Sequence, residues 1–115
     1  MNDRTGQALG LGKFSLGGND EDIKIEIGQV RQYLKEVAKI KKEGNEQEFV
    51  DLHFDWALKL LKQGQPERDV KEIEYLVELN ANDIFRFLPV ALKLTTKEKV
   101  IEAEKAAEAQ EKAKN

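Results

Sequence analysis

The sequence predicts an all-α protein, a small bundle of four to five helices. Hydrophobic residues recur at helical spacing through most of residues 29–101, which favours amphipathic helices. The composition, 40% hydrophobic and 36% charged, suits a helical protein with a small core. With 115 residues the chain is long enough for one domain at most. We divide it into a leader (1–22), a helical domain (23–101) and a charged tail (102–115).

The stretch FVDLHFDWALKLLK, residues 49–62, is expected to be the central helix. On a helix its apolar side chains and His53 cover an arc of roughly 240°, well beyond the stripe of an ordinary surface helix. Such a helix must be covered on most sides, so Trp56 is expected in the core. It should begin near Glu46, end at Gly64, and run antiparallel to a helix over residues 29–43, because the connection between them is short.

Two more helices are expected before the tail. Pro66 suits the first turn of one, and Asn80 is a good N-cap for the next, which reads NDIFRFLPVALKL. Pro89 lies inside this second helix and predicts a kink, or a break near Leu88.

The last helix should begin at the capping-box pattern of residues 95–98, TTKE. From residue 102 the chain is mostly Ala, Glu and Lys. This tail can form a helix but has little reason to pack, so it should fray or project into solvent.

The leader, residues 1–22, carries five of the eight glycines and is predicted to be flexible. It is either an ordinary disordered segment or a docking segment that orders on a partner. The following run, IKIEI at residues 23–27, alternates as a short strand does. That strand could pair with the leader, pair with another subunit, or run extended into the first helix.

The residue inventory argues against catalysis. The absence of cysteine excludes disulfides, thiolate zinc sites and cysteine nucleophiles, and fits a reducing cytoplasm. Ser15 is the only serine, so no Ser-His-Asp triad is plausible, and the lone His53 is expected to be a satisfied core residue. No phosphate-binding loop, EF-hand or zinc pattern is present. We therefore expect no catalytic, cofactor or metal site.

The charge and the hydropathy of the chain argue against nucleic acid and membranes as partners. The net charge is −3 and the basic residues are scattered among acids, which argues against nucleic acid. No apolar run approaches the roughly 20 residues that span a bilayer. A soluble cytoplasmic protein is expected.

The two most apolar of the expected helices are FVDLHFDWALKLLK and NDIFRFLPVALKL. Together they carry more hydrophobic surface than so short a chain should bury, which favours a protein–protein interaction surface. A kink in the fourth helix would leave Phe85, Phe87 and Val90 uncovered, so these are the expected partner-binding residues. Phe14 and Leu16 of the leader are secondary candidates.

The order of these features resembles a known family. An extended IKIEI leads into QVRQYLKEVAKIKKE, then the aromatic helix EFVDLHFDWALKLL, the acidic region ERDVKEIEYLVELNANDIFRFL and a charged run after TTKEK. From residue 23 to 115 this resembles the small tail assembly chaperones of long-tailed bacteriophages of Gram-positive hosts.

The resemblance implies a non-enzymatic protein of the bacterial host cytoplasm that acts in virion morphogenesis. It would bind the tape-measure protein and tail-tube subunits, and it could form a homo-oligomer, as family members often do. The family has no motif-defined catalytic residues. The residues alone leave another class open, a small helical regulatory or adaptor protein that binds another protein.

Overall fold

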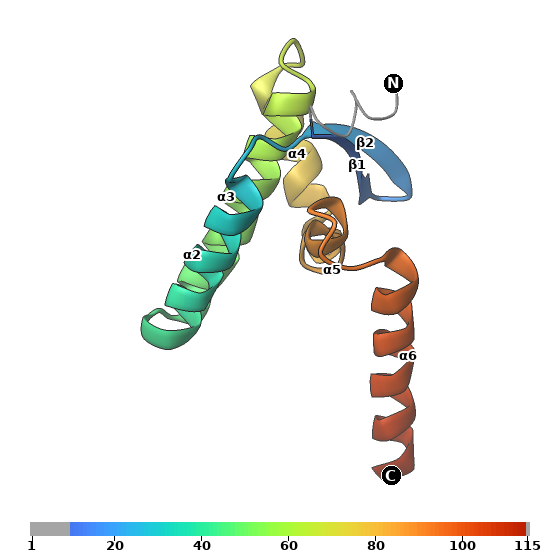
Figure 1. Cartoon of the computed structure of the whole chain (residues 1–115). Helices are drawn as coiled ribbons and strands as arrows, with labels where there is room; N and C mark the ends of the chain where they lie inside the picture. Colours follow the sequence, from blue (N-terminus) through green and yellow to red (C-terminus); the bar gives the residue numbers. More distant parts are fainter. Residues whose placement is uncertain (1–9, 115) are drawn as a thin grey trace.

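The computed structural model describes residues 10–114 of the chain, with side chains through residue 111 (Figure 1). This part contains a β-hairpin and five helices, in the order β1 (Leu11–Leu16), β2 (Asn19–Lys24), α2 (Gln29–Glu43), α3 (Glu46–Gly64), α4 (Val70–Leu79), α5 (Ala81–Ala91) and α6 (Lys97–Lys114). The protein is mostly helical, as predicted, but it is not purely α because of the hairpin.

The hairpin corrects the prediction for the leader. Strands β1 and β2 pair antiparallel, from Leu11 opposite Lys24 to Leu16 opposite Asn19. The two-residue turn between them, residues 17–18, has φ angles of 61° and 84°, which glycine adopts without strain and which the tight turns of β-hairpins require. The prediction of a flexible leader is therefore wrong for residues 10–22, whereas residues 1–9 lie outside the described chain.

The strand predicted at residues 23–27 is also displaced. Strand β2 ends at Lys24, and its partner is the leader, which was one of the three alternatives. The inward side chains of the hairpin, Phe14, Leu16 and Ile23, are at most 1% exposed and belong to the main hydrophobic core. The hairpin is thus a structural part of the domain.

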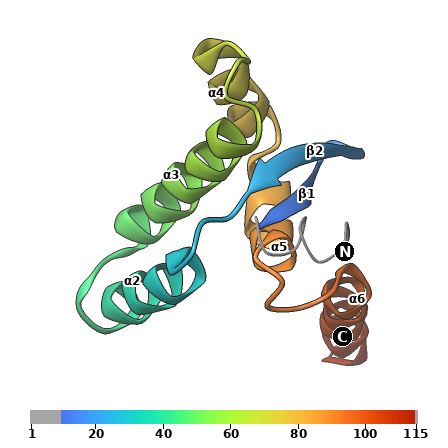
Figure 2. The ribbon, with the colours of Figure 1, turned by 45° about the horizontal axis from the view of Figure 1, so that its top comes forward.

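Helix α3 is the central element, as predicted. It contacts β2, α2, α4 and α5 and buries Trp56, Ala57, Leu60 and Leu61. Its first residue and its last, Gly64, agree with the sequence prediction, and it runs antiparallel to α2 (Figure 2). At Gly64 the helix meets β2 so closely that an added Cβ would lie 2.4 Å from the Cα of Ile23.

Helices α4 and α5 differ from the predictions at their ends. Pro66 precedes α4 in a turn, and the helix begins only after Asp69, whose side chain accepts a hydrogen bond from the amide of Lys71 at 2.9 Å. Helix α5 passes through Pro89 without a break near Leu88. A proline removes only its own backbone hydrogen bond, and the last turn of α5 keeps its bond from the Leu92 amide to the Leu88 carbonyl at 2.9 Å.

The C-terminal end of α5 is a complete Schellman motif. The amide of Leu94 donates to the carbonyl of Pro89, and the amide of Lys93 donates to that of Val90, both at 2.9 Å. Lys93 itself is the one described non-glycine residue with a positive φ, 63°. A lysine therefore occupies a position that glycine usually fills, which costs backbone energy.

Helix α6 projects away from the other helices (Figure 1), as expected for the tail. The Thr96 side chain accepts a hydrogen bond from the amide of Lys99 at 3.3 Å, so the cap lies one residue later than the predicted box. Arg86 of α5 anchors the helix through a bidentate contact with Glu104, at 2.6 and 2.9 Å.

Candidate partner-binding surface

Three of the five residues predicted to bind a partner are buried. Phe87 is 5% exposed, so the expectation that it is uncovered is wrong. Phe14 and Leu16, the secondary candidates, are fully buried. Strand β1 packs directly on α5, which the prediction of a flexible leader did not allow. Of the predicted set, Phe85 is 36% exposed and Val90 is half-buried.

Phe87 is also enclosed by cations. The guanidinium of Arg86 lies 4.6 Å from the centre of its ring, and the ammonium of Lys97 lies 5.3 Å away. The first contact lies within α5, and the contact with Lys97 ties α5 to the start of α6. Phe87 thus has a structural role.

Phe85 belongs to a cluster of aromatic rings where α2, α3 and α5 meet. Its ring centre lies 5.3 Å from that of His53 and 6.0 Å from that of Phe54. Tyr33 stands edge-on to His53 at 5.7 Å, and Phe49 lies 4.4 Å from it. Phe49 and Phe54 are half-buried, so the cluster has a solvent-facing side to which Phe85 contributes most.

His53, at the centre of this cluster, is a satisfied core residue, as the sequence indicates. Its Nδ1 lies 2.8 Å from the carbonyl oxygen of Phe49, which can only accept, so Nδ1 carries the proton. Nε2 then accepts from the hydroxyl of Tyr33 at 3.0 Å. Burial lowers the pKa of His53 and raises the pKa of Tyr33, so it favours the neutral form of both side chains.

An apolar groove at the start of α2 was not anticipated. It has a volume of about 540 Å³, and we call it the Ile27 groove; its lining residues are Glu26, Ile27, Gly28, Val30, Arg31 and Leu34. The side chain of Ile27 is fully exposed, and Leu34 is 48% exposed. The alternation of IKIEI had grouped Ile27 with the buried Ile23, whereas β2 ends before this residue.

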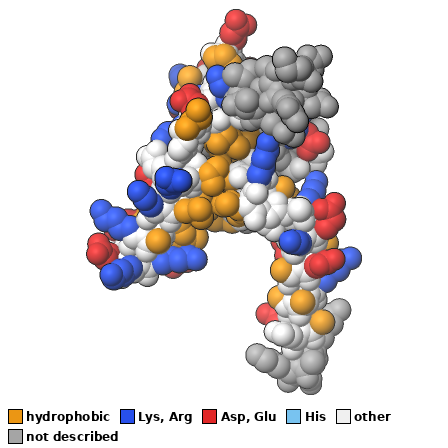
Figure 3. Space-filling view, in the orientation of Figure 1, with side chains coloured by type: hydrophobic (Ala, Val, Ile, Leu, Met, Phe, Trp, Pro, Cys, Tyr) orange, Lys and Arg blue, Asp and Glu red, His pale blue; other side chains and the backbone are white. Residues whose placement is uncertain are grey.

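Hydrophobic surface is not confined to one groove. The space-filling view shows apolar side chains gathered between the α2–α3 pair and α5 (Figure 3). Surfaces of this kind are typical of sites that bind another protein. The geometry therefore favours recognition of a partner through apolar contacts.

The described residues offer little for other kinds of chemistry. Across residues 10–111, whose side chains are described, no group of three or more His, Cys, Asp or Glu side chains could hold a metal ion. In the same range every buried side-chain nitrogen and oxygen has a hydrogen-bond partner. None of the helices described is both long enough and apolar enough to cross a bilayer.

Comparison of the sequence with protein-family models finds no match, and comparison with curated proteins and with solved structures finds none either.

Proposed function

We propose that this chain is a non-enzymatic tail assembly chaperone of a long-tailed bacteriophage. It would bind apolar helical segments of the tape-measure protein, tail-tube subunits or both while the tail is built. The observation that carries the binding part of the proposal is the Ile27 groove, in which one isoleucine side chain is left entirely in solvent. The phage part is supported by the resemblance of residues 23–115 to that family.

The groove suits a helix that presents an apolar stripe. Covering a side chain such as Ile27 removes apolar area from water and is worth about 1.5–3 kcal/mol. Leu34, in the second turn of α2, lines the same groove, and Phe85 supplies a second apolar contact on α5. An amphipathic helix laid in a hydrophobic groove is a common mode of recognition. The partner's apolar face would be protected from aggregation until tube contacts replace the chaperone.

Co-expression with the protein of the neighbouring tape-measure gene tests the proposal. We expect a soluble complex whose formation has a negative heat-capacity change and a mild salt dependence, because apolar burial drives it. Ile27→Asp and Leu34→Asp should abolish the complex and leave the helical circular dichroism unchanged, since both residues are exposed. Leu79→Asp, at a residue of α4 that is 64% exposed, is the matched control.

Two results would contradict the proposal. One is a tape-measure protein that stays insoluble beside a correctly folded chain. The other is equal capture by the wild type and by Ile27→Asp. The small regulatory or adaptor protein would then become the better hypothesis.

A further inference from the structure

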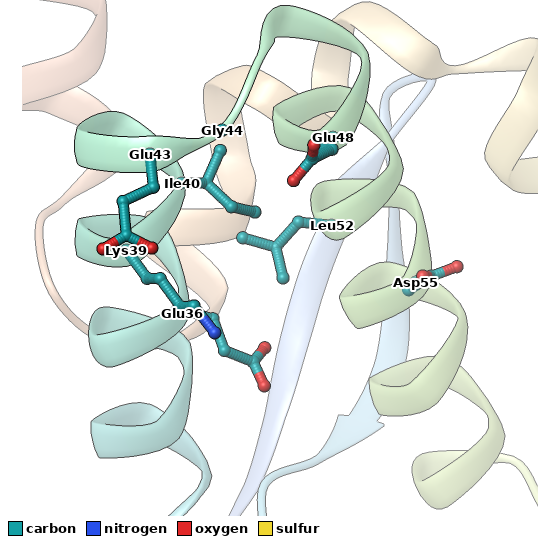
Figure 4. Close-up of a pocket in the computed structure, with 8 residues that line it drawn as sticks. All are labelled: Glu36, Lys39, Ile40, Glu43, Gly44, Glu48, Leu52 and Asp55. Atoms are coloured by element: carbon teal, nitrogen blue, oxygen red, sulfur yellow. The ribbon is translucent and has the colours of Figure 1, made fainter.

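A second groove, of about 500 Å³, lies along the outside of the α2–α3 pair (Figure 4). Near the connecting loop its walls carry Glu43 on α2 and Glu48 on α3. Towards the other end they carry Glu36 on α2 and Asp55 on α3. Ile40 and Leu52 point toward one another between these two acidic levels. We call this the α2–α3 groove.

The lining of this groove carries an excess of negative charge. Four carboxylates line it against the single ammonium of Lys39. Among the residues that the structure describes, none of the four takes part in an ion pair. Glu36 accepts hydrogen bonds from the Trp56 indole at 2.8 Å and from Gln32 at 3.0 Å, which orient its carboxylate without neutralising it. A cationic ligand would relieve this repulsion.

The spacing of the carboxylates identifies the kind of cation. The acidic residues of each helix are seven positions apart, which is about 10 Å along the axis. Within the described chain they do not converge as metal ligands do. Two levels of negative charge with an aliphatic pair between them match an elongated ligand that has separated cations and an apolar middle.

We propose that the α2–α3 groove docks a basic amphipathic helix of a partner protein. Lysine or arginine side chains two turns apart would meet the two acidic levels, and aliphatic side chains one turn from each would lie on Ile40 and Leu52. This surface is separate from the Ile27 groove, and the inference does not depend on the proposed function.

Calorimetric titration with a synthetic helix tests this. The probe is an alanine-rich peptide with two lysines two turns apart and two leucines between them. It should bind at low salt, and Glu43→Gln with Glu48→Gln should weaken binding about fivefold to tenfold, the loss of two exposed ion pairs. The matched control is Glu102→Gln with Glu108→Gln on α6, which removes the same charge from exposed positions and should leave affinity unchanged.

Several outcomes would overturn the inference. They are no binding of the peptide, unchanged affinity in the Glu43/Glu48 variant, and equal binding of a peptide with glutamates in place of the lysines. Equal binding of a peptide with alanines in place of the leucines would mean that charge alone acts, which also overturns it. Ile27→Asp should leave peptide binding intact, so failure here is distinguishable from failure of the proposed function.

Discussion

Trp56 gives the sharpest test of the fold, because several contacts converge on it. The residue is 2% exposed, and its Nε1–H donates to the Glu36 carboxylate at 2.8 Å. Its ring stands edge-on to Tyr33 at 6.0 Å, and the Lys59 ammonium lies 4.6 Å from the ring centre. Replacing Trp56 by alanine removes all of these and leaves a cavity, so we expect a loss of about 3–5 kcal/mol in the free energy of unfolding.

Urea denaturation followed by far-ultraviolet circular dichroism measures this loss, since the only tryptophan is absent from the variant. A loss of this size is a large share of the about 5–15 kcal/mol that stabilises a domain, and it should lower the melting temperature by at least about 12 °C. Trp56→Phe keeps most of the ring and forfeits chiefly the hydrogen bond, so its cost should be about 1–2 kcal/mol. An alanine variant that melts at the wild-type temperature would refute the placement of Trp56 in the core.

Three further predictions follow from the backbone and the core. Because burial lowers the pKa of His53, its contribution to the free energy of unfolding should be fully present above about pH 6.5 and be lost as the pH falls through the lower folded-state pKa. The urea midpoint of His53→Gln should therefore vary less with pH than that of the wild type. Parallel pH profiles of the two proteins would count against this. Lys93→Gly should raise the melting temperature by about 2–6 °C, because glycine adopts a positive φ without the steric cost that a lysine has there. An unchanged melting temperature would indicate that the turn is unstrained. Phe14→Ala should cost about 3–5 kcal/mol, and a cost below about 1 kcal/mol would mean that the hairpin does not belong to the core.

The bounds of α2 and α3 could be predicted because local chemistry determines them. Gly44 and Asn45 end one helix and begin the next, and the Asn45 side chain accepts from the Glu48 amide at 2.9 Å. The glycine content of residues 1–22 predicts flexibility and so conceals the hairpin. The adjacent glycines at residues 17–18 suit a tight hairpin turn, and β1 alternates in sequence, but β2 opens with four polar residues, NDED, so alternation alone does not identify its strand.

The partner surface depended on tertiary packing and was less predictable. The apolar residues of α5 seemed to need a partner, but β1 packs on α5 from within the chain, and Phe87 is buried. Ile27 shows the opposite error, because its place in an alternating run suggested burial, although the strand ends three residues earlier. Sequence spacing tells which residues share a face, whereas exposure depends on what packs against that face.

The contact between the hairpin and α5 has a consequence for synthesis on the ribosome. The Gly17 amide donates to the Asp83 carboxylate at 2.8 Å across a separation of 66 residues. At about 5–20 residues per second, α5 is made about 3–13 s after the hairpin turn. An isolated two-stranded hairpin is only marginally stable, so Phe14, Leu16 and their neighbours stay uncovered for this interval. The N-terminal strands are translated first, yet they can reach their native environment only when most of the chain has been made.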